Sequence, residues 1–202
     1  MNHTYNLPNE QNQPTPYETD SNALIIIGAN GAGKSKLGAW IEQQDFENVH
    51  RIGAQRNLNF NENISLKNYS QAEDLVFWGT CEDGQKRDKG YRWGWDNSYT
   101  TKLMNDFEDV LAALIALKNN ENDVFIEKSR KTQEGKNPMP HIPITSIDIL
   151  ISIWKDVFPQ RDLLLEDSKF YAVFLKNGEY VKYSANQMSD GERAVLYLAA
   201  QV

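Results

Sequence analysis

Cysteine is almost absent: Cys81 is the only one among 202 residues. A single thiol cannot form an internal disulfide and makes no Cys-x-x-Cys pair, which excludes a disulfide framework and a zinc-thiolate site. This usage is typical of a reducing compartment. The sequence also lacks any apolar run near the roughly 18 residues of a membrane span, and its polar start does not resemble a signal peptide. We therefore expect a cytoplasmic protein without a membrane partner.

Basic residues are fewer than acidic ones, with 21 Lys and Arg against 28 Asp and Glu, which gives a net charge of −7. This balance argues against a protein that binds nucleic acid over its whole surface, although a local basic patch remains compatible with it. Charged residues make up 24% and apolar residues 40%, as in a chain that folds around a core. His3, His50 and His141 have no metal-ligand spacing.

The pattern near the start of the chain predicts a parallel sheet. Residues 23–27 are a continuous apolar run before a glycine, typical of a strand buried on both faces. Apolar residues at helical spacing predict a helix over 34–44, and residues 49–54 would form the next strand of a βαβ unit. We therefore predict an α/β fold with a mainly parallel sheet.

The rest of the chain is predicted to add helices and a hairpin to this single domain. The expected divisions are a flexible lead-in (1–22), an insertion or long loop (57–98), a helical subdomain (99–160), and a hairpin with a final helix (161–202). Helices are expected over 100–117 and over 146–158, the second opened by Thr145 and Asp148 in a capping box. Asn177-Gly178 predicts the hairpin turn, because both residues tolerate positive φ.

A glycine loop carries the strongest functional signal. Residues 28–35, Gly-Ala-Asn-Gly-Ala-Gly-Lys-Ser, fit the P-loop pattern G-x-x-x-x-G-K-[ST] at every constrained position. Backbone N–H groups would converge on a β-phosphate, Lys34 would neutralise the β- and γ-phosphates, and the Ser35 hydroxyl would ligate Mg²⁺. The alternative is a glycine turn that matches by chance. The predicted phosphate-binding residues are Asn30, Gly31, Ala32, Gly33, Lys34, Ser35 and Lys36.

A second element lies about 150 residues later. Met188-Ser189-Asp190-Gly191-Glu192 is a turn of small and polar residues that leads into an apolar helix. The N-terminus of a helix suits an anion. An ordinary N-cap built on Ser189 explains the same local sequence.

Together the two elements resemble the ABC-type ATPases, most closely the branch with SMC and RecF proteins and the ATPase domains of OLD-family and related bacterial anti-phage effectors. The resemblance implies a head that sandwiches ATP and Mg²⁺ in a homodimer or higher oligomer. Ser189, Asp190, Gly191 and Glu192 would then face the γ-phosphate held by the opposite subunit. It further implies ATP hydrolysis that controls DNA engagement or an effector nuclease.

The same resemblance assigns Gln55 to Mg²⁺ and the attacking water, which makes Gln55 and Lys34 the catalytic candidates. A plain polar pair with Arg56 at a strand end is the alternative. Lys36 stands where relatives usually have Ser or Thr, so a hydroxyl contact to the α-phosphate is lost.

The acidic strand that follows the signature helix in this family has no counterpart before Val202. Residues 163–167 are apolar and end in Glu-Asp, but they precede the signature and are interpreted as a core strand. We therefore expect a carboxyl-terminally incomplete ATPase domain that binds nucleotide more convincingly than it hydrolyses it.

Two other functions follow from the same residues. A non-hydrolysing ATP-sensing module that assembles with a partner is the main alternative, and a small-molecule kinase is disfavoured because no arginine-rich lid is evident. Separately, basic and aromatic residues alternate over a short stretch, as on a surface that stacks on nucleobases. A solvated loop with two of its aromatic side chains packed on the core is the favoured interpretation, because acidic residues lie among them. The stretch comprises Arg87, Lys89, Tyr91, Arg92, Trp93 and Trp95.

Overall fold

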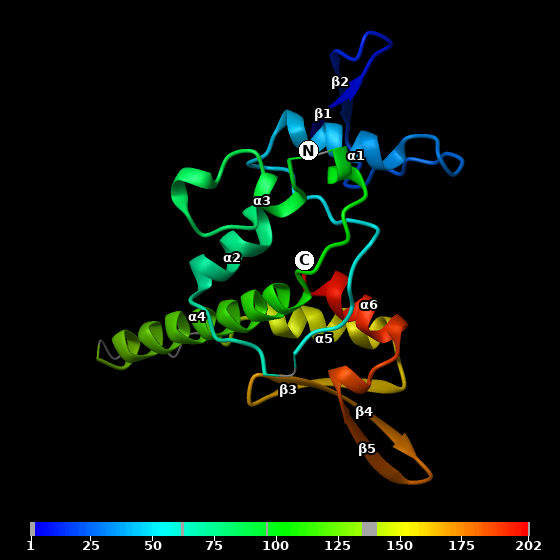
Figure 1. Cartoon of the computed structure of the whole chain (residues 1–202). Helices are drawn as coiled ribbons and strands as arrows, with labels where there is room; N and C mark the ends of the chain where they lie inside the picture. Colours follow the sequence, from blue (N-terminus) through cyan, green and yellow to red (C-terminus); the bar gives the residue numbers. More distant parts are fainter. Residues whose placement is uncertain (1–2, 62, 96, 135–140, 202) are drawn as a thin grey trace. The chain divides into compact units, whose positions relative to one another are not determined.

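The computed structural model describes residues 3–61, 63–95, 97–134 and 141–201. These residues form two compact units. The first unit comprises Met1–Gln55 and Phe77–Leu103, and the second comprises Arg56–Val76 and Met104–Val202. Figure 1 shows the order of their elements along the chain.

The first unit begins with an antiparallel hairpin of β1 (His3–Pro8) and β2 (Pro14–Thr19). Tyr5 pairs with Tyr17 across this hairpin, and their rings stack with centroids 5.8 Å apart. The lead-in expected over residues 1–22 thus contains regular structure. The remaining elements of this unit are α1 (Lys34–Gln44), α3 (Gly90–Trp93) and the 3₁₀ turns Asp83–Gln85 and Asn97–Thr100. Helix α2 (Tyr69–Trp78) contains the boundary between the units.

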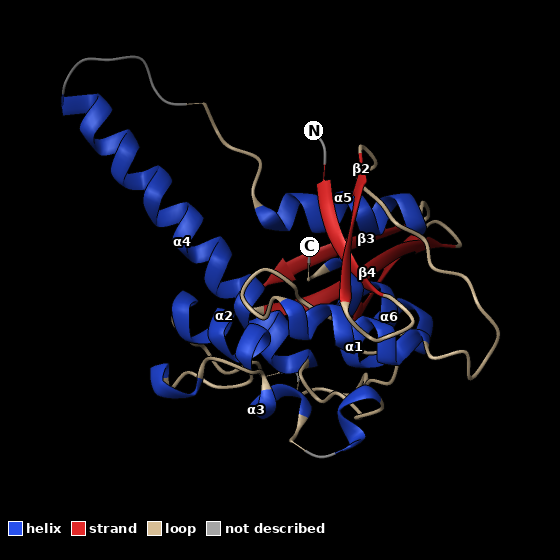
Figure 2. Cartoon of the chain, turned by 90° about the horizontal axis from the view of Figure 1, so that it is seen from above, coloured by secondary structure: helices blue, strands red, loops and turns tan. Residues whose placement is uncertain are grey.

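Among its described residues, the second unit contains three complete helices, part of α2 and a three-stranded antiparallel sheet in the order β3-β4-β5. Helix α5 packs along β3 (Figure 2). The elements are α4 (Phe107–Glu134), α5 (Ser146–Val157), β3 (Arg161–Glu166), β4 (Lys169–Lys176), β5 (Glu179–Ser184), the 3₁₀ turn Ala185–Gln187 and α6 (Asp190–Ala199).

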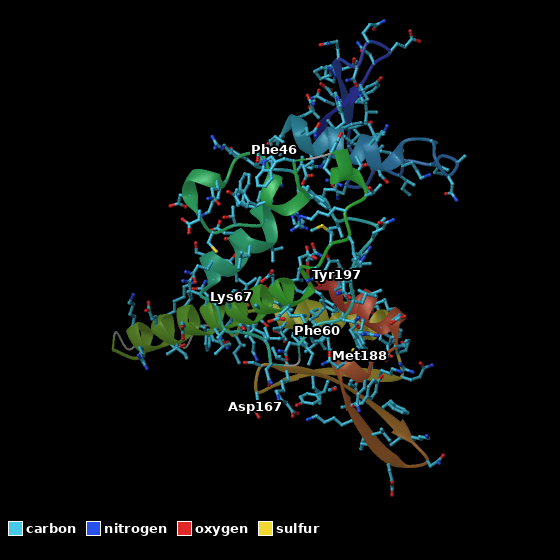
Figure 3. The ribbon with its side chains drawn as sticks, viewed as in Figure 1. Phe46, Phe60, Lys67, Asp167, Met188 and Tyr197 are labelled. Atoms are coloured by element: carbon cyan, nitrogen blue, oxygen red, sulfur yellow. The ribbon has the colours of Figure 1, made fainter. Side chains whose placement is uncertain are left out.

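Aromatic side chains fill the interior of the second unit. The centroid of the Phe107 ring lies 4.7 Å from that of Phe60 and 5.3 Å, edge-on, from that of Tyr197. Phe60 and Tyr197 are labelled in Figure 3. The Tyr197 hydroxyl donates to Asp106 over 2.8 Å, so this polar tip is satisfied inside the core. Trp154 of α5 is completely buried in the same cluster.

The predicted parallel sheet is wrong. Both sheets among the described residues are antiparallel, with two and three strands. Residues 23–27 and 49–54 are not strands, and Ile25 and Ile27 are 82% and 90% exposed. Both runs have β-propensity, but a strand exists only where a neighbour completes its hydrogen-bond ladder. The P-loop and ABC-type head fold inferred from these runs is therefore not the observed fold.

Predictions that depended on nearby residues were confirmed. Helix α1 covers the predicted 34–44, and α5 begins with a capping box between Thr145 and Asp148. Asn177 and Gly178 have φ values of 53° and 85° and connect β4 to β5. Residues 163–165 lie in β3 with Leu163 buried, as expected of a core strand.

Helix α4 differs from the predicted helix over 100–117. It begins at Phe107 and continues past Asn119 and Asn120 to Glu134. Asparagine is only mildly unfavourable inside a helix, and Glu121 accepts hydrogen bonds from the amide and hydroxyl of Ser146, which ties α4 to the start of α5. The interval 57–98, expected to be a loop, contains α2 and α3. None of the helices within the described residues combines the length and apolarity needed to cross a bilayer.

Candidate functional site

The glycine loop, residues 28–35, leads directly into α1. Gly31 and Gly33 have φ values of 82° and 87°, a region that side chains with a Cβ rarely adopt. The Ala32 amide donates to the Ala29 carbonyl over 3.1 Å, which closes a tight turn between residues 29 and 32. Two glycines with positive φ thus allow the backbone to bend sharply just before the helix begins.

The N-terminus of α1 has no side-chain cap. Gly33 occupies the N-cap position in a left-handed conformation, and the first turn contains no acidic residue. The amide of Leu37 makes the first intrahelical hydrogen bond, to the Gly33 carbonyl, so the amides of residues 34–36 precede the helical ladder. These donors and the helix dipole create a positive potential at an exposed surface. This end of the helix therefore favours an anion.

Lys34 folds back over the glycine loop. Its ammonium donates to the carbonyls of Gly28 and Ala29 at 2.7 and 2.8 Å. Ser35 and Lys36 are exposed beside it in the first turn of α1. The loop thus places a cation, a hydroxyl and uncapped amides at one surface, a combination that suits a phosphate group.

Gln55 belongs to the same unit as the glycine loop, but it lies in an exposed bend and not at the end of a strand. Arg56 belongs to the second unit, where it forms an isolated parallel bridge with Met104. Its guanidinium lies 5.0 Å from the Tyr197 ring centroid, a cation–π contact that gives Arg56 a packing role.

The structure contains no group of three or more His, Cys, Asp or Glu side chains, within the described residues, that could hold a metal ion. Magnesium at nucleotide sites is commonly held by one or two protein oxygens together with phosphate oxygens. The exposed Ser35 hydroxyl is compatible with that arrangement.

The signature segment lies in the second unit, at the start of α6. Ser189 is the N-cap, and its hydroxyl donates to the Glu192 carboxylate over 2.7 Å while accepting from the Glu192 amide. Asp190 pairs with Arg193 over 2.7 Å, and Gly191 is exposed. The N-cap interpretation of Ser189 is therefore confirmed, and Ser189 and Glu192 form a capping box within their own helix.

Glu192 anchors this cap to the sheet. Its side chain is buried, and its carboxylate also accepts hydrogen bonds from Arg161 of β3 and Tyr183 of β5. Burial acts to raise the pKa of Glu192, but the hydrogen bonds from Tyr183, Ser189 and Arg161 outweigh it and keep this pKa below its usual range. Burial and the bond to Glu192 raise the pKa of Tyr183 to about 12.

Replacing Glu192 with glutamine should therefore change the pH dependence of stability. A depressed carboxyl pKa stabilises the fold above the unfolded value of 4.5, and this contribution is lost as the pH falls through the lower folded value. We expect Glu192→Gln to lower the free energy of unfolding by about 1–3 kcal/mol at neutral pH, a difference that shrinks in acid. Urea unfolding from pH 7 to 3 measures this. Asp190→Asn is the control, and equal losses at all pH values would contradict the assignment.

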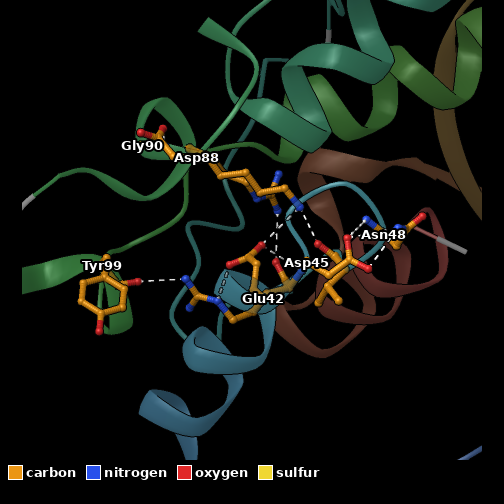
Figure 4. A network of polar contacts seen from close by, with 10 residues as sticks. Glu42, Asp45, Asn48, Asp88, Gly90 and Tyr99 are labelled. Atoms are coloured by element: carbon orange, nitrogen blue, oxygen red, sulfur yellow. Dashed lines mark hydrogen bonds and ion pairs between the residues drawn. The ribbon is translucent and has the colours of Figure 1, made fainter. Parts of the chain in front are cut away.

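A buried polar network in the first unit was not predicted from the sequence. Glu42 of α1 is 2% exposed, and it accepts from Arg51 Nε over 2.9 Å and from Lys89 Nζ over 3.4 Å (Figure 4). Lys89 Nζ also donates to the Val49 carbonyl and lies 3.6 Å from the Phe77 ring centroid. Burial lowers the pKa of Lys89, while Glu42 opposes this shift.

We searched protein-family models, curated proteins and solved structures for likeness to this chain. None matches. Functional inference therefore depends on the residues themselves. The glycine loop with its uncapped helix is the strongest candidate site, and the signature segment belongs to the other unit.

Proposed function

We propose that this chain binds ATP with Mg²⁺ at the glycine loop and α1, and that the complete protein hydrolyses it at an interface between two such chains. Hydrolysis would control DNA engagement or an associated effector such as a nuclease, as the resemblance to SMC- and RecF-type ATPases implies. The observation that carries this proposal is the sharply turned loop that feeds an uncapped helix N-terminus under the Lys34 ammonium.

Each part of the loop has a physical task in this proposal. Positive φ at Gly31 and Gly33 lets the backbone curve around a phosphate, whose oxygens would accept from the first amides of α1. The Lys34 ammonium would exchange its carbonyl acceptors for β- and γ-phosphate oxygens, which form stronger, charge-assisted hydrogen bonds. The Ser35 hydroxyl would hold Mg²⁺ together with phosphate oxygens.

A non-hydrolysing ATP sensor that assembles with a partner is the second candidate. It is favoured by the hydrogen bonds at the start of α6. Ser189 bonds to Glu192, and Glu192 also bonds to Arg161 and Tyr183. Side chains held in a helix cap support a fixed binding surface without taking part in chemistry. ATP-dependent dimerisation without phosphate release would support this candidate, whereas phosphate release would support the ATPase.

Replacing Lys34 with alanine tests nucleotide binding by the loop. We expect ATP affinity, measured by isothermal titration calorimetry with Mg²⁺, to fall about 10- to 100-fold, because hydrogen bonds to charged groups are each worth about 1.5–3 kcal/mol. Lys128→Ala removes the same charge from the exposed surface of α4 and should leave the affinity unchanged. Unchanged ATP affinity in a folded Lys34→Ala variant would exclude the proposed role of the loop.

A further inference from the structure

The first unit contains an open cavity of about 480 Å³. Its lining comes from three parts of the unit: α1, the residues that follow α1, and residues between Asp88 and Tyr99. Four of the lining residues carry aromatic rings: Phe46, Trp93, Trp95 and Tyr99. This volume is within the range of small-molecule sites, which are typically apolar and contain a few well-placed polar groups. The cavity lies wholly within one unit and does not include the glycine loop.

Trp95 presents an indole that is held in place yet open to solvent. It is 68% exposed, although large aromatic side chains are usually well buried. A Cβ at Gly90 would lie 2.0 Å from Trp95 Nε1, so the indole rests directly against the Gly90 backbone. The Tyr91 ring meets it edge-on with centroids 4.7 Å apart. A fixed, exposed ring of this kind can stack on a flat ligand at little entropic cost.

Charged side chains next to the cavity bond to one another and to its aromatic wall. Arg51 pairs with Glu42, and its guanidinium covers one face of Trp93 at 3.5 Å, so that face is already occupied. Lys89 and Arg92 lie next to this pair. The positive groups here are Arg51, Lys89 and Arg92, and the negative groups are Glu42 and Asp88. Because Glu42 is already paired with Arg51 and Lys89, the ring of a ligand needs no charge of its own to fit the cavity.

Two polar side chains at the cavity can form hydrogen bonds to the edge of such a ring. The Gln43 amide is exposed at the lining and offers a donor and an acceptor. Asp88 accepts from the Gly90 amide over 3.0 Å through Oδ1, and its carboxylate has further acceptor capacity. Ring nitrogens, exocyclic amines and carbonyls of a nucleobase present the complementary groups.

We propose that this cavity binds a nucleobase, stacked on Trp95 and hydrogen-bonded at its edge by Gln43 and Asp88. The base belongs either to a free nucleoside or nucleotide or to a single strand of nucleic acid, because both present the same ring. The proposal does not depend on the glycine loop, since a nucleoside without phosphates is sufficient to test it.

Titration of the full chain with adenosine and with guanosine, followed by calorimetry, tests the site. We expect saturable binding of at least one nucleoside, and we expect Trp95→Ala to weaken it about ten-fold or more, as loss of a stacking partner does. Gln43→Ala should also weaken it. Gln44→Ala, one residue further on α1 but outside the lining, and Tyr180→Ala, an exposed aromatic of the second unit, should not.

The outcomes separate the two sources of the base and the two proposed sites. ATP binding more tightly than adenosine, with the difference lost in Lys34→Ala, identifies a nucleotide that spans both sites. A single-stranded oligonucleotide binding more tightly than the nucleosides, independently of Lys34, identifies a nucleic acid. Lack of nucleoside binding, binding unaffected by Trp95→Ala, or preference for a quaternary ammonium ion over nucleosides would overturn the proposal whatever Lys34→Ala does to ATP.

Discussion

Replacing Glu42 with alanine is expected to lower the free energy of unfolding by about 3–5 kcal/mol, since removing one partner of a buried ion pair leaves the other charge uncompensated. The Lys89 side chain is completely buried and would keep the Val49 carbonyl and the rings of Phe77 and Trp78 near its ammonium, but it would lose the Glu42 carboxylate. Arg51 would lose its carboxylate partner as well. Urea unfolding followed by tryptophan fluorescence measures the loss.

Three measurements identify the buried lysine as the cause. Glu47→Ala removes an exposed carboxylate just beyond α1 and should change stability by no more than about 0.5 kcal/mol. Adding Lys89→Met to Glu42→Ala should recover part of the loss. The loss of unfolding free energy should also diminish as the pH rises toward 10.5. Burial lowers the pKa of Lys89 in the folded chain, so over this range the unfolded chain binds more protons than the folded one. Strictly additive effects of the two substitutions would contradict this explanation.

Replacing Trp154 with alanine should destabilise the second unit by about 3–5 kcal/mol, because it leaves a large cavity in a closed core. Trp154 is fully buried, and the centroid of its ring lies 4.8 Å from that of the Phe158 ring. Trp154→Phe should cost less because it retains most of the packing. Val157→Ala, in the same helix at a side chain that is 50% exposed, is the control in thermal unfolding. A loss for Trp154→Ala no larger than the control would show that the site repacks.

Elements fixed by nearby residues could be predicted from the sequence. The capping box of α5 connects Thr145 to Asp148, and the turn between β4 and β5 needs only two residues with positive φ. These interactions span three residues or fewer, so the local pattern contains the information. The sequence placed the end of α4 near Asn119 and Asn120, but α4 continues to Glu134. Its Glu121 contacts Ser146 across 25 residues, a partner that no local pattern indicates.

The sheet could not be predicted in the same way. An apolar run such as residues 24–27 shows that a strand is possible, but the pairing partner decides whether it forms. Within the part of the chain that the structure describes, each strand pairs with strands adjacent to it in sequence, and residues 24–27 stay exposed. Parallel pairing requires a crossover connection between distant segments, and the apolar pattern of one segment does not indicate whether such a connection exists.

The motif of the glycine loop predicts a phosphate site that stays a prediction, whereas no motif indicates the buried network around Glu42. The spacing of Gly28, Gly33 and Lys34 indicates a phosphate loop without any knowledge of the fold. The contact of Glu42 with Lys89 joins residues 47 positions apart, and the basic and aromatic stretch that contains Lys89 does not indicate this partner. At α6 the sequence left two interpretations of Ser189, and only the hydrogen bonds to Glu192 establish the cap.

The position of Lys34 has an energetic consequence for any anion that enters the glycine loop. A lysine on an open surface normally samples many rotamers, and ordering it on binding carries an entropic penalty of up to about 2 kcal/mol. Here the two carbonyl contacts already restrict those rotamers before an anion arrives. If an anion binds there as we propose, the ammonium would exchange one set of acceptors for another and lose little side-chain freedom.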